Sequence, residues 1–206
     1  PTSAITIDAT LNPDFSQIEL DSPQLSGNTR FGIFVQEKRP FFLEGADIFR
    51  TPLNAISTRT IANPDVGLRY TQRDADKDFS VLSSRDTAGA LVLVPQTYFT
   101  GYATSQVAST ATDARANFRR GSLSLGAVLT DRQYAQGVGY NRVAGPDFVW
   151  QIDRNQLMRA QVLMSTTNAQ MNAQGNLARA NTTDGHAAYF DWSRGNDAWG
   201  MSVNVR

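Results

Sequence analysis

From residue 66 to the C-terminus, hydrophobic and polar positions alternate in runs that short polar turns separate. In the clearest run, every second residue is hydrophobic and the residues between are small or polar: Leu123, Leu125, Ala127 and Leu129 against Ser122, Ser124, Gly126 and Thr130. A period of two predicts β-strands, because successive side chains of a strand point to opposite faces of the sheet. Short turns between such runs indicate antiparallel pairing. The sequence therefore predicts an all-β, antiparallel fold.

The other runs that alternate, or that are short and apolar, lie at 66–73, 79–84, 91–94, 115–119, 148–152, 158–164, 188–192 and 199–205. Residues 74–78 have the composition of a hairpin loop, and Arg120-Gly121 and 154–156 turn the chain between other runs. Residues 169–185 read as a long polar connection. Short turns at one side and longer connections at the other are typical of membrane barrels.

Before residue 66 the pattern is different. A short strand is expected at 5–8, and Pro13, Pro23, Pro40 and Pro52 then interrupt a stretch in which neither a helix nor a strand period is sustained. One helical turn is expected near 44–49. We therefore divide the chain into an irregular N-terminal segment, 1–65, that acts as a plug or periplasmic contact, and strands at 66–206.

Alternation alone does not separate a membrane barrel from a soluble β-sandwich, whose inner face is equally apolar. Hydrophobic residues make up only 41% of the chain, yet its 11 Phe, 6 Tyr and 3 Trp argue against disorder. A barrel wall needs apolar residues on its lipid face alone. Trp150, Trp192 and Trp199 stand near strand ends on the apolar side, where an aromatic girdle would place them. We predict an antiparallel transmembrane β-barrel, present as a partial barrel, with a soluble sheet as the alternative.

The charge and cysteine content exclude several functions. The chain has 19 basic and 19 acidic residues and no basic block, which argues against nucleic acid as a partner. With no cysteine, it has no disulfide, thiol nucleophile or cysteine-bound zinc. No run of 18 apolar residues predicts a membrane-spanning helix, and no signal peptide precedes Pro1. We expect a piece of a larger barrel that does not fold alone, because an unclosed sheet leaves two unpaired edges.

Two opening motifs resemble a known bacterial family. They run from Asp8 to Glu19, DATLNPDFSQIE, and from Glu37 to Phe49, EKRPFFLEGADIF. The chain resembles the family of domain of unknown function 5916, and the likeness continues from Ser84 to Pro95 and from Tyr140 to Phe148. Two departures are Leu20, where the family has a small residue, and Gln36, where it commonly has proline.

The resemblance implies an outer-membrane β-barrel domain that follows a family 9-like carbohydrate-binding module. It therefore implies a bacterial outer-membrane location, with lipid as partner and carbohydrate reached through the upstream module. The expected role is a surface anchor or a channel associated with carbohydrate binding or uptake. The alternative is a membrane-associated hydrolase that acts on carbohydrate with carboxylates in residues 12–50.

That alternative depends on a cluster of acidic residues: Asp14, Glu19, Asp21, Glu37, Glu44 and Asp47. Glycoside hydrolysis needs two carboxylates across a sugar, and Glu37 and Glu44 are the candidates for catalysis. The same segment holds Arg30, Lys38, Arg39 and Arg50, so structural ion pairs are the competing interpretation. We expect no catalytic residue unless geometry supports one.

Candidate ligand contacts are Phe41 and Phe42, whose rings can stack on sugars, and Arg115 and Arg159, which can line a lumen. Phe31, Phe34 and Phe49 can also stack on sugars, and the alternative for these aromatic residues is that they anchor the segment within its own domain. Arg119 and Asp153 can also line a lumen, and the alternative for these charged residues is a salt-bridged interior without an open pore. His186, the only histidine, is expected in an exposed turn. Asp74, Asp76 and Asp78 lack the glycine and glutamate of a calcium loop, so neither metal nor cofactor is expected.

Overall fold

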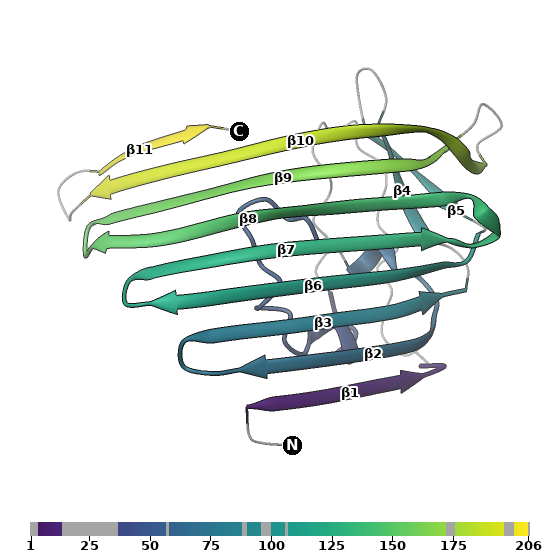
Figure 1. The fold of residues 1–206 in the computed structure, drawn as a ribbon, viewed down its shortest axis with the longest axis horizontal. Coiled ribbons are helices and arrows are strands. Elements are labelled where there is room, and N and C mark those ends of the chain that lie inside the picture. The colour runs from purple at the N-terminus through teal and green to yellow at the C-terminus, as the bar shows by residue number, and fades with distance from the viewer. Residues whose placement is uncertain are drawn as a thin grey trace.

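The computed structural model describes residues 4–13, 37–56, 58–87, 90–95, 100–105, 107–171, 176–195 and 200–205. Nine strands form one antiparallel sheet in the order β1-β2-β3-β6-β7-β8-β9-β10-β11, and β4 and β5 pair separately (Figure 1). The strand bounds are β1 Ile5–Leu11, β2 Pro64–Arg73, β3 Lys77–Asp86, β4 Ala90–Pro95, β5 Thr100–Ser105, β6 Ser109–Arg120, β7 Leu123–Tyr134, β8 Gly139–Asp153, β9 Gln156–Met171, β10 Leu177–Gly195 and β11 Gly200–Val205. The predicted all-β, antiparallel fold is confirmed. The sheet is open, with β1 at one edge and β11 at the other.

Each alternating run coincides with a strand, and several strands are longer than predicted. The long connection predicted at 169–185 is wrong, because 169–171 end β9 and 177–185 begin β10, where Ala178 pairs with Gln170 and Thr183 with Thr167. Polar residues occupy both faces of this part of the sheet, so no hydrophobic alternation marks it. The backbone ladder forms regardless, because it depends on N–H and C=O groups and not on side chains.

The described part of the irregular segment contains a short α-helix, α1 (Pro40–Leu43), and a 3₁₀ turn, η1 (Thr58–Thr60); a second 3₁₀ turn, η2 (Ala135–Gly137), lies between β7 and β8. The predicted helical turn at 44–49 is wrong, because the helix lies earlier. Pro40 occupies the first helical turn, where its missing N–H is no loss. Glu44 is extended and ends the helix, Gly45 follows with a φ of 70°, and tight turns carry the chain to Phe49.

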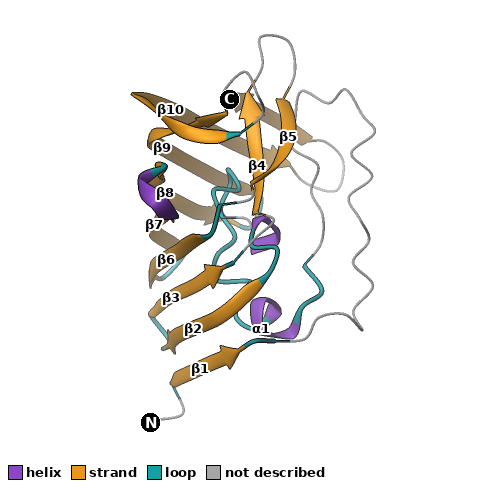
Figure 2. Cartoon of the chain, turned by 90° about the vertical axis from the view of Figure 1, so that its right-hand side faces the viewer, coloured by secondary structure: helices purple, strands orange, loops and turns teal. Residues whose placement is uncertain are grey.

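Residues 37–63 lie against one face of the sheet, which we call the inner face (Figure 2). The sheet itself takes strands from both sides of residue 65, since β1 pairs with β2 in register. Phe42 of α1 and Ile61 pack on Leu82 of β3 and Ala111 of β6, and these four form a small buried apolar cluster. The apolar core is therefore local, and it joins the segment to the middle of the sheet.

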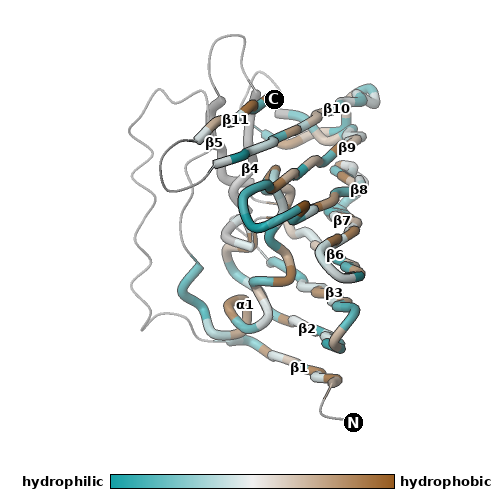
Figure 3. Tube along the Cα trace, turned by 90° about the vertical axis from the view of Figure 1, so that its left-hand side faces the viewer, coloured by the Kyte–Doolittle hydropathy of each residue, from teal (hydrophilic) through white to brown (hydrophobic). Residues whose placement is uncertain are grey.

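The opposite, outer face carries the hydrophobic residues of the alternation and nothing in the described chain covers it. Leu125, Val162 and Met201 are 51%, 43% and 50% exposed. Buried inner-face positions include many charged or polar residues, such as Arg69, Ser80 and Arg115, beside apolar ones such as Leu82 and Val128. Hydrophobic and hydrophilic residues alternate along the trace in Figure 3. Among the described residues, no helix has the length and apolar character needed to cross a membrane.

Candidate functional site

Residues 47–53, which we call the crossing segment, run over the inner face from β2 to β9. At the first end, Arg73 donates two hydrogen bonds, of 2.8 and 2.5 Å, to the carboxylate of Asp47. At the other end, the backbone N–H of Leu53 donates to Oε1 of Gln161 over 2.6 Å. The segment is thus attached to strands that lie five places apart in the sheet.

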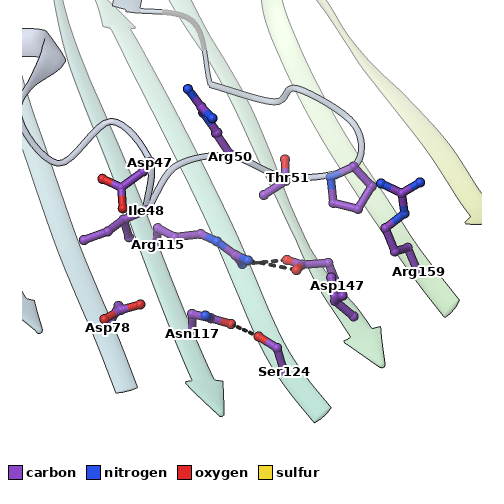
Figure 4. A pocket seen from close by; sticks show the side chains of 12 residues that line it. Asp47, Ile48, Arg50, Thr51, Asp78, Arg115, Asn117, Ser124, Asp147 and Arg159 are labelled. Carbon is purple, nitrogen blue, oxygen red and sulfur yellow. Dashed lines mark hydrogen bonds and ion pairs between the residues drawn. The ribbon is translucent and has the colours of Figure 1, made fainter. Parts of the chain in front are cut away.

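A hollow of about 320 Å³ lies between the crossing segment and the sheet (Figure 4). The segment contributes one wall, and β3, β6, β7, β8 and β9 contribute the rest. The lining residues are Asp47, Ile48, Arg50, Thr51, Pro52, Asp78, Arg115, Asn117, Ser124, Asp147, Val149 and Arg159. The hollow is therefore polar and holds three arginines and three aspartates.

A buried ion pair forms part of the sheet side of this hollow. Arg115 of β6 donates from Nη1 and Nη2 to both carboxylate oxygens of Asp147 on β8, at 2.5 and 2.8 Å. Both side chains are at most 5% exposed. The guanidinium crosses β7 at Gly126, where a Cβ would overlap both terminal nitrogens. Glycine is thus required here by the close approach of a charged side chain, and not by its own backbone conformation.

The other charges of the hollow also have partners, except one. Arg159 donates from Nε and Nη2 to Asp191 of β10, at 3.0 and 2.7 Å. Asp78 accepts from Arg119. Arg50 is exposed, and its side chain makes no ion pair or hydrogen bond within the described residues. Its charge acts on Asp47, whose pKa is lowered first by the hydrogen bonds from Arg73.

The first of the two predicted catalytic carboxylates, Glu37, takes part in a buried arginine cluster. Arg39 donates to Glu37 at 2.9 and 2.8 Å and to the carbonyl oxygens of Ile61 and Thr58 at 2.6 and 2.8 Å. Burial raises the pKa of Glu37, but hydrogen bonds from Arg39 and Thr58 outweigh it and leave that pKa below its usual value. A carboxyl held ionised in this way is poorly suited to donate a proton as a general acid.

The second carboxylate, Glu44, pairs with Arg69 of β2. Arg69 is 1% exposed and bonds to Asp8 on β1 at 2.7 Å, to Glu44 at 2.8 Å and to the carbonyl oxygen of Phe41 at 2.5 Å. Glu37 and Glu44 are thus held by different arginines. Both contacts attach the irregular segment to itself or to the sheet.

The predicted aromatic contacts have different surroundings. Phe42 is 3% exposed and lies in the apolar cluster, with the Arg39 guanidinium 4.2 Å from its ring centroid. Phe41 is partly buried and meets Phe42 edge to face at 5.1 Å. Its ring lies over Gly67 of β2, where a Cβ would come within 2.7 Å of it. These contacts anchor the segment to the sheet.

Other candidates fall elsewhere. His186 is exposed on β10, inside a strand and not in the expected turn. Asp153 ends β8 and accepts hydrogen bonds from its own turn, and Asp74 accepts from Gln72. The part of the chain that the structure describes contains no group of three or more potential metal ligands. The candidates that lie outside the described residues are Asp14, Glu19, Asp21, Arg30, Phe31, Phe34 and Trp199.

Sequence reasoning selected Arg115 and Arg159 but missed their partners Asp147 and Asp191; it named Arg50 only as a candidate for a structural ion pair, and Gly126 only as a position on the polar side of a strand. A usable signal was present, since Asp147 and Asp191 stand on the polar side of their alternating runs. Which aspartate meets which arginine depends on strand register, which alternation does not give.

The profile of a domain of unknown function, DUF5916, matches residues 2–82. The predicted resemblance is confirmed over that range, and it stays a prediction for 84–95, 140–148 and the carbohydrate-binding context. No curated protein matches the chain.

Two solved structures are similar in fold. OmpTdeltaL8, a loop L8 deletion mutant of the Vibrio cholerae outer membrane protein OmpT, matches with a TM-score of 0.44 and 11% identity, over 70% of this chain and 50% of that one. In-vitro folded OmpT of the same organism gives a TM-score of 0.41 and 11% identity, over 72% and 48%. The chain thus spans about half the length of these structures.

Proposed function

We propose that the nine-stranded sheet is part of the wall of a bacterial outer-membrane β-barrel, with residues 37–63 folded against its inner face as a plug. One observation carries this proposal: the sheet exposes its hydrophobic face and buries its charged face. A soluble sheet would place the apolar face in the core and the charged face in water. Lipid is the medium that suits the observed arrangement.

The exposed residues are large and spread over the whole sheet. They are Ile7 and Leu11 on β1, Val66 and Leu68 on β2, Phe79 on β3, Phe118 on β6, Leu125 and Leu129 on β7, Trp150 and Ile152 on β8, Val162 and Met164 on β9, Phe190 on β10, and Met201, Val203 and Val205 on β11. Scattered apolar residues are normal on a soluble surface, but a continuous apolar face of this extent marks an interaction surface. The proposed partner of this surface is outer-membrane lipid.

Between an anchor and an open channel, the inner face favours an anchor. Ion pairs link β6 to β8 across β7 and β9 to β10 on this face, and the crossing segment is attached at both ends. Both features occupy space that an open passage would need. The carbohydrate-binding module that the family resemblance implies is no part of this proposal.

Two neighbouring residues of β7 test the proposal at the same depth. The sequence has no cysteine, so Leu129→Cys and Val128→Cys each give one labelling site. Leu129 is 47% exposed on the outer face and Val128 is 2% exposed on the inner face. A fluorophore attached before folding should be quenched by brominated lipid at position 129 and not at 128. Equal quenching at both positions, or none at 129, would overturn the proposal.

A simpler measurement uses the unlabelled, full-length protein. A detergent-stable barrel resists unfolding by SDS until it is heated, so unheated and boiled samples should migrate differently on a gel. Identical migration of a correctly folded sample would contradict a closed barrel.

A further inference from the structure

We infer that the hollow beneath the crossing segment is a binding site for a small sugar acid, a polyhydroxylated molecule with one carboxylate. This inference goes beyond the proposed membrane role. It starts from the walls of the hollow, which bring Arg50 of the crossing segment and Arg159 of β9 to one space (Figure 4). Residues far apart in the sequence therefore line one space, with Arg50 free of an ion pair there and Arg159 already paired with Asp191.

The charge balance of the hollow favours a monoanion. Asp47, Asp78, Asp147 and Asp191 each accept hydrogen bonds from one arginine: Arg73, Arg119, Arg115 and Arg159 in that order. Arg50 is a fifth arginine and makes no ion pair in the described chain. Arg50 is thus the lining arginine without an ion-pair partner in the described chain, and one carboxylate would supply that partner.

Unused hydrogen-bond donors accompany that charge. Asp191 occupies Nε and Nη2 of Arg159, which is 43% exposed, and leaves Nη1 for another acceptor. Nε of Arg115 is buried without a hydrogen-bond partner among the described residues. That nitrogen is shielded from solvent, so the donors open to a ligand are those of Arg50 and Arg159. Arginine also matches the planar, two-oxygen geometry of a carboxylate.

The remaining lining residues suit hydroxyl groups. Oγ of Ser124 donates to Oδ1 of Asn117 over 2.6 Å, which leaves the amide nitrogen of Asn117 as a donor. Thr51 and the aspartate oxygens add acceptors at the walls. A volume of about 320 Å³ lies near the lower end of the range for small-molecule sites, about 300–1,000 Å³. A single sugar ring that carries a carboxylate fits both the size and this mixture of groups.

The site can be tested by titration calorimetry of the full-length protein folded in detergent. D-glucuronate is the ligand, and D-glucose, which has the same ring without the carboxylate, is the neutral control. We expect saturable binding of glucuronate and at least about tenfold weaker binding of glucose, the ratio for one charge-assisted hydrogen bond. Arg50→Gln and Arg159→Gln should each weaken glucuronate binding by about tenfold or more. Arg154→Gln, an exposed arginine of the β8–β9 turn, is the matched control and should leave it unchanged.

Two results would overturn the site: no saturable heat with glucuronate, or an equal affinity in the wild type and Arg50→Gln. Equal binding of glucose would overturn the role of the carboxylate. Arg50 is exposed, so Arg50→Gln is expected to fold, and heat-modifiable migration of each variant checks this. A wild-type protein that migrates as a barrel yet binds no glucuronate contradicts the site alone. Binding without quenching by brominated lipid contradicts the membrane role alone.

Discussion

The two faces of the sheet are built from the same strands but follow opposite rules. On the outer face, hydrophobic side chains such as Leu125 and Val203 are about half exposed. On the inner face, arginines such as Arg69 and Arg115 are almost wholly buried. The outer face needs only an apolar surface, so many different hydrophobic side chains can occupy each of its positions. The inner face needs a partner for each buried charge, so individual residues there cannot be exchanged freely.

The inner face also shows a second contrast, between its apolar and its charged parts. Below α1, Phe42, Ile61, Leu82 and Ala111 pack as a small core. Below the crossing segment, the Arg115–Asp147 pair replaces a core. An apolar core is stabilised by the contact area between its side chains, whereas an ion pair is stabilised only when its two groups keep their geometry. Mutations should therefore destabilise the first part by leaving a cavity and the second by leaving a buried charge without its partner.

The largest effect is expected in the apolar cluster. Phe42→Ala leaves a cavity between α1 and the sheet and should lower the free energy of unfolding by about 4 kcal/mol, measured by urea titration in detergent. Leu43→Ala, the next residue of the same helix, is the control, because Leu43 is 43% exposed and should change stability far less. Equal losses would show that α1 does not bury Phe42.

Gly126→Ala should come next. Its methyl group would displace the Arg115 guanidinium from Asp147 and leave a buried pair broken, which costs about 3 kcal/mol in the same titration. Gly200→Ala on β11 is the matched strand glycine, since no atom lies within 4 Å of its added Cβ. A neutral Gly126→Ala would mean that Arg115 does not cross β7 at this point.

On the outer face, Leu125→Arg should reduce stability in lipid by about 2 kcal/mol, because an arginine must then reach the headgroups or remain in hydrocarbon. Gln133→Arg, on the same strand and face but past the hydrophobic run, should have little effect. Unfolding in liposomes measures both. If Leu125→Arg were as stable as the wild type in lipid, the outer face would not contact hydrocarbon.

The smallest effect concerns pH. The folded pKa of Glu37 is lowered, so its contribution to stability is complete above the unfolded value of about 4.5 and is lost as the pH falls through the folded pKa. Glu37→Gln should remove about 1.5 kcal/mol at pH 7 and flatten this acid dependence. Asp47→Asn is the comparison: the pKa of Asp47 is also lowered, but its pair with Arg73 is exposed and contributes less. Unchanged acid dependence in Glu37→Gln would contradict the assigned pair.

The sequence by itself determined the strands and their faces. Hydrophobic residues at every second position, as in 123–129, place Leu125 and Gly126 on opposite sides whatever the neighbours are, because the side-chain period of a strand is two. It also determined that Arg115 and Arg159 belong to the polar face. The extension of β10 back to Leu177 escaped it, because polar residues on both faces leave no alternation to detect.

Only the tertiary structure decided which residues meet. Arg115 finds Asp147 across an intervening strand, 32 residues along the chain, and only a glycine at position 126 leaves room for it. Arg50 comes to line the same hollow as Arg159 through the path of the crossing segment, which no local pattern specifies. Register and loop path arise from the sum of backbone pairing and side-chain contacts over the whole sheet, so they cannot be read from any one run of residues.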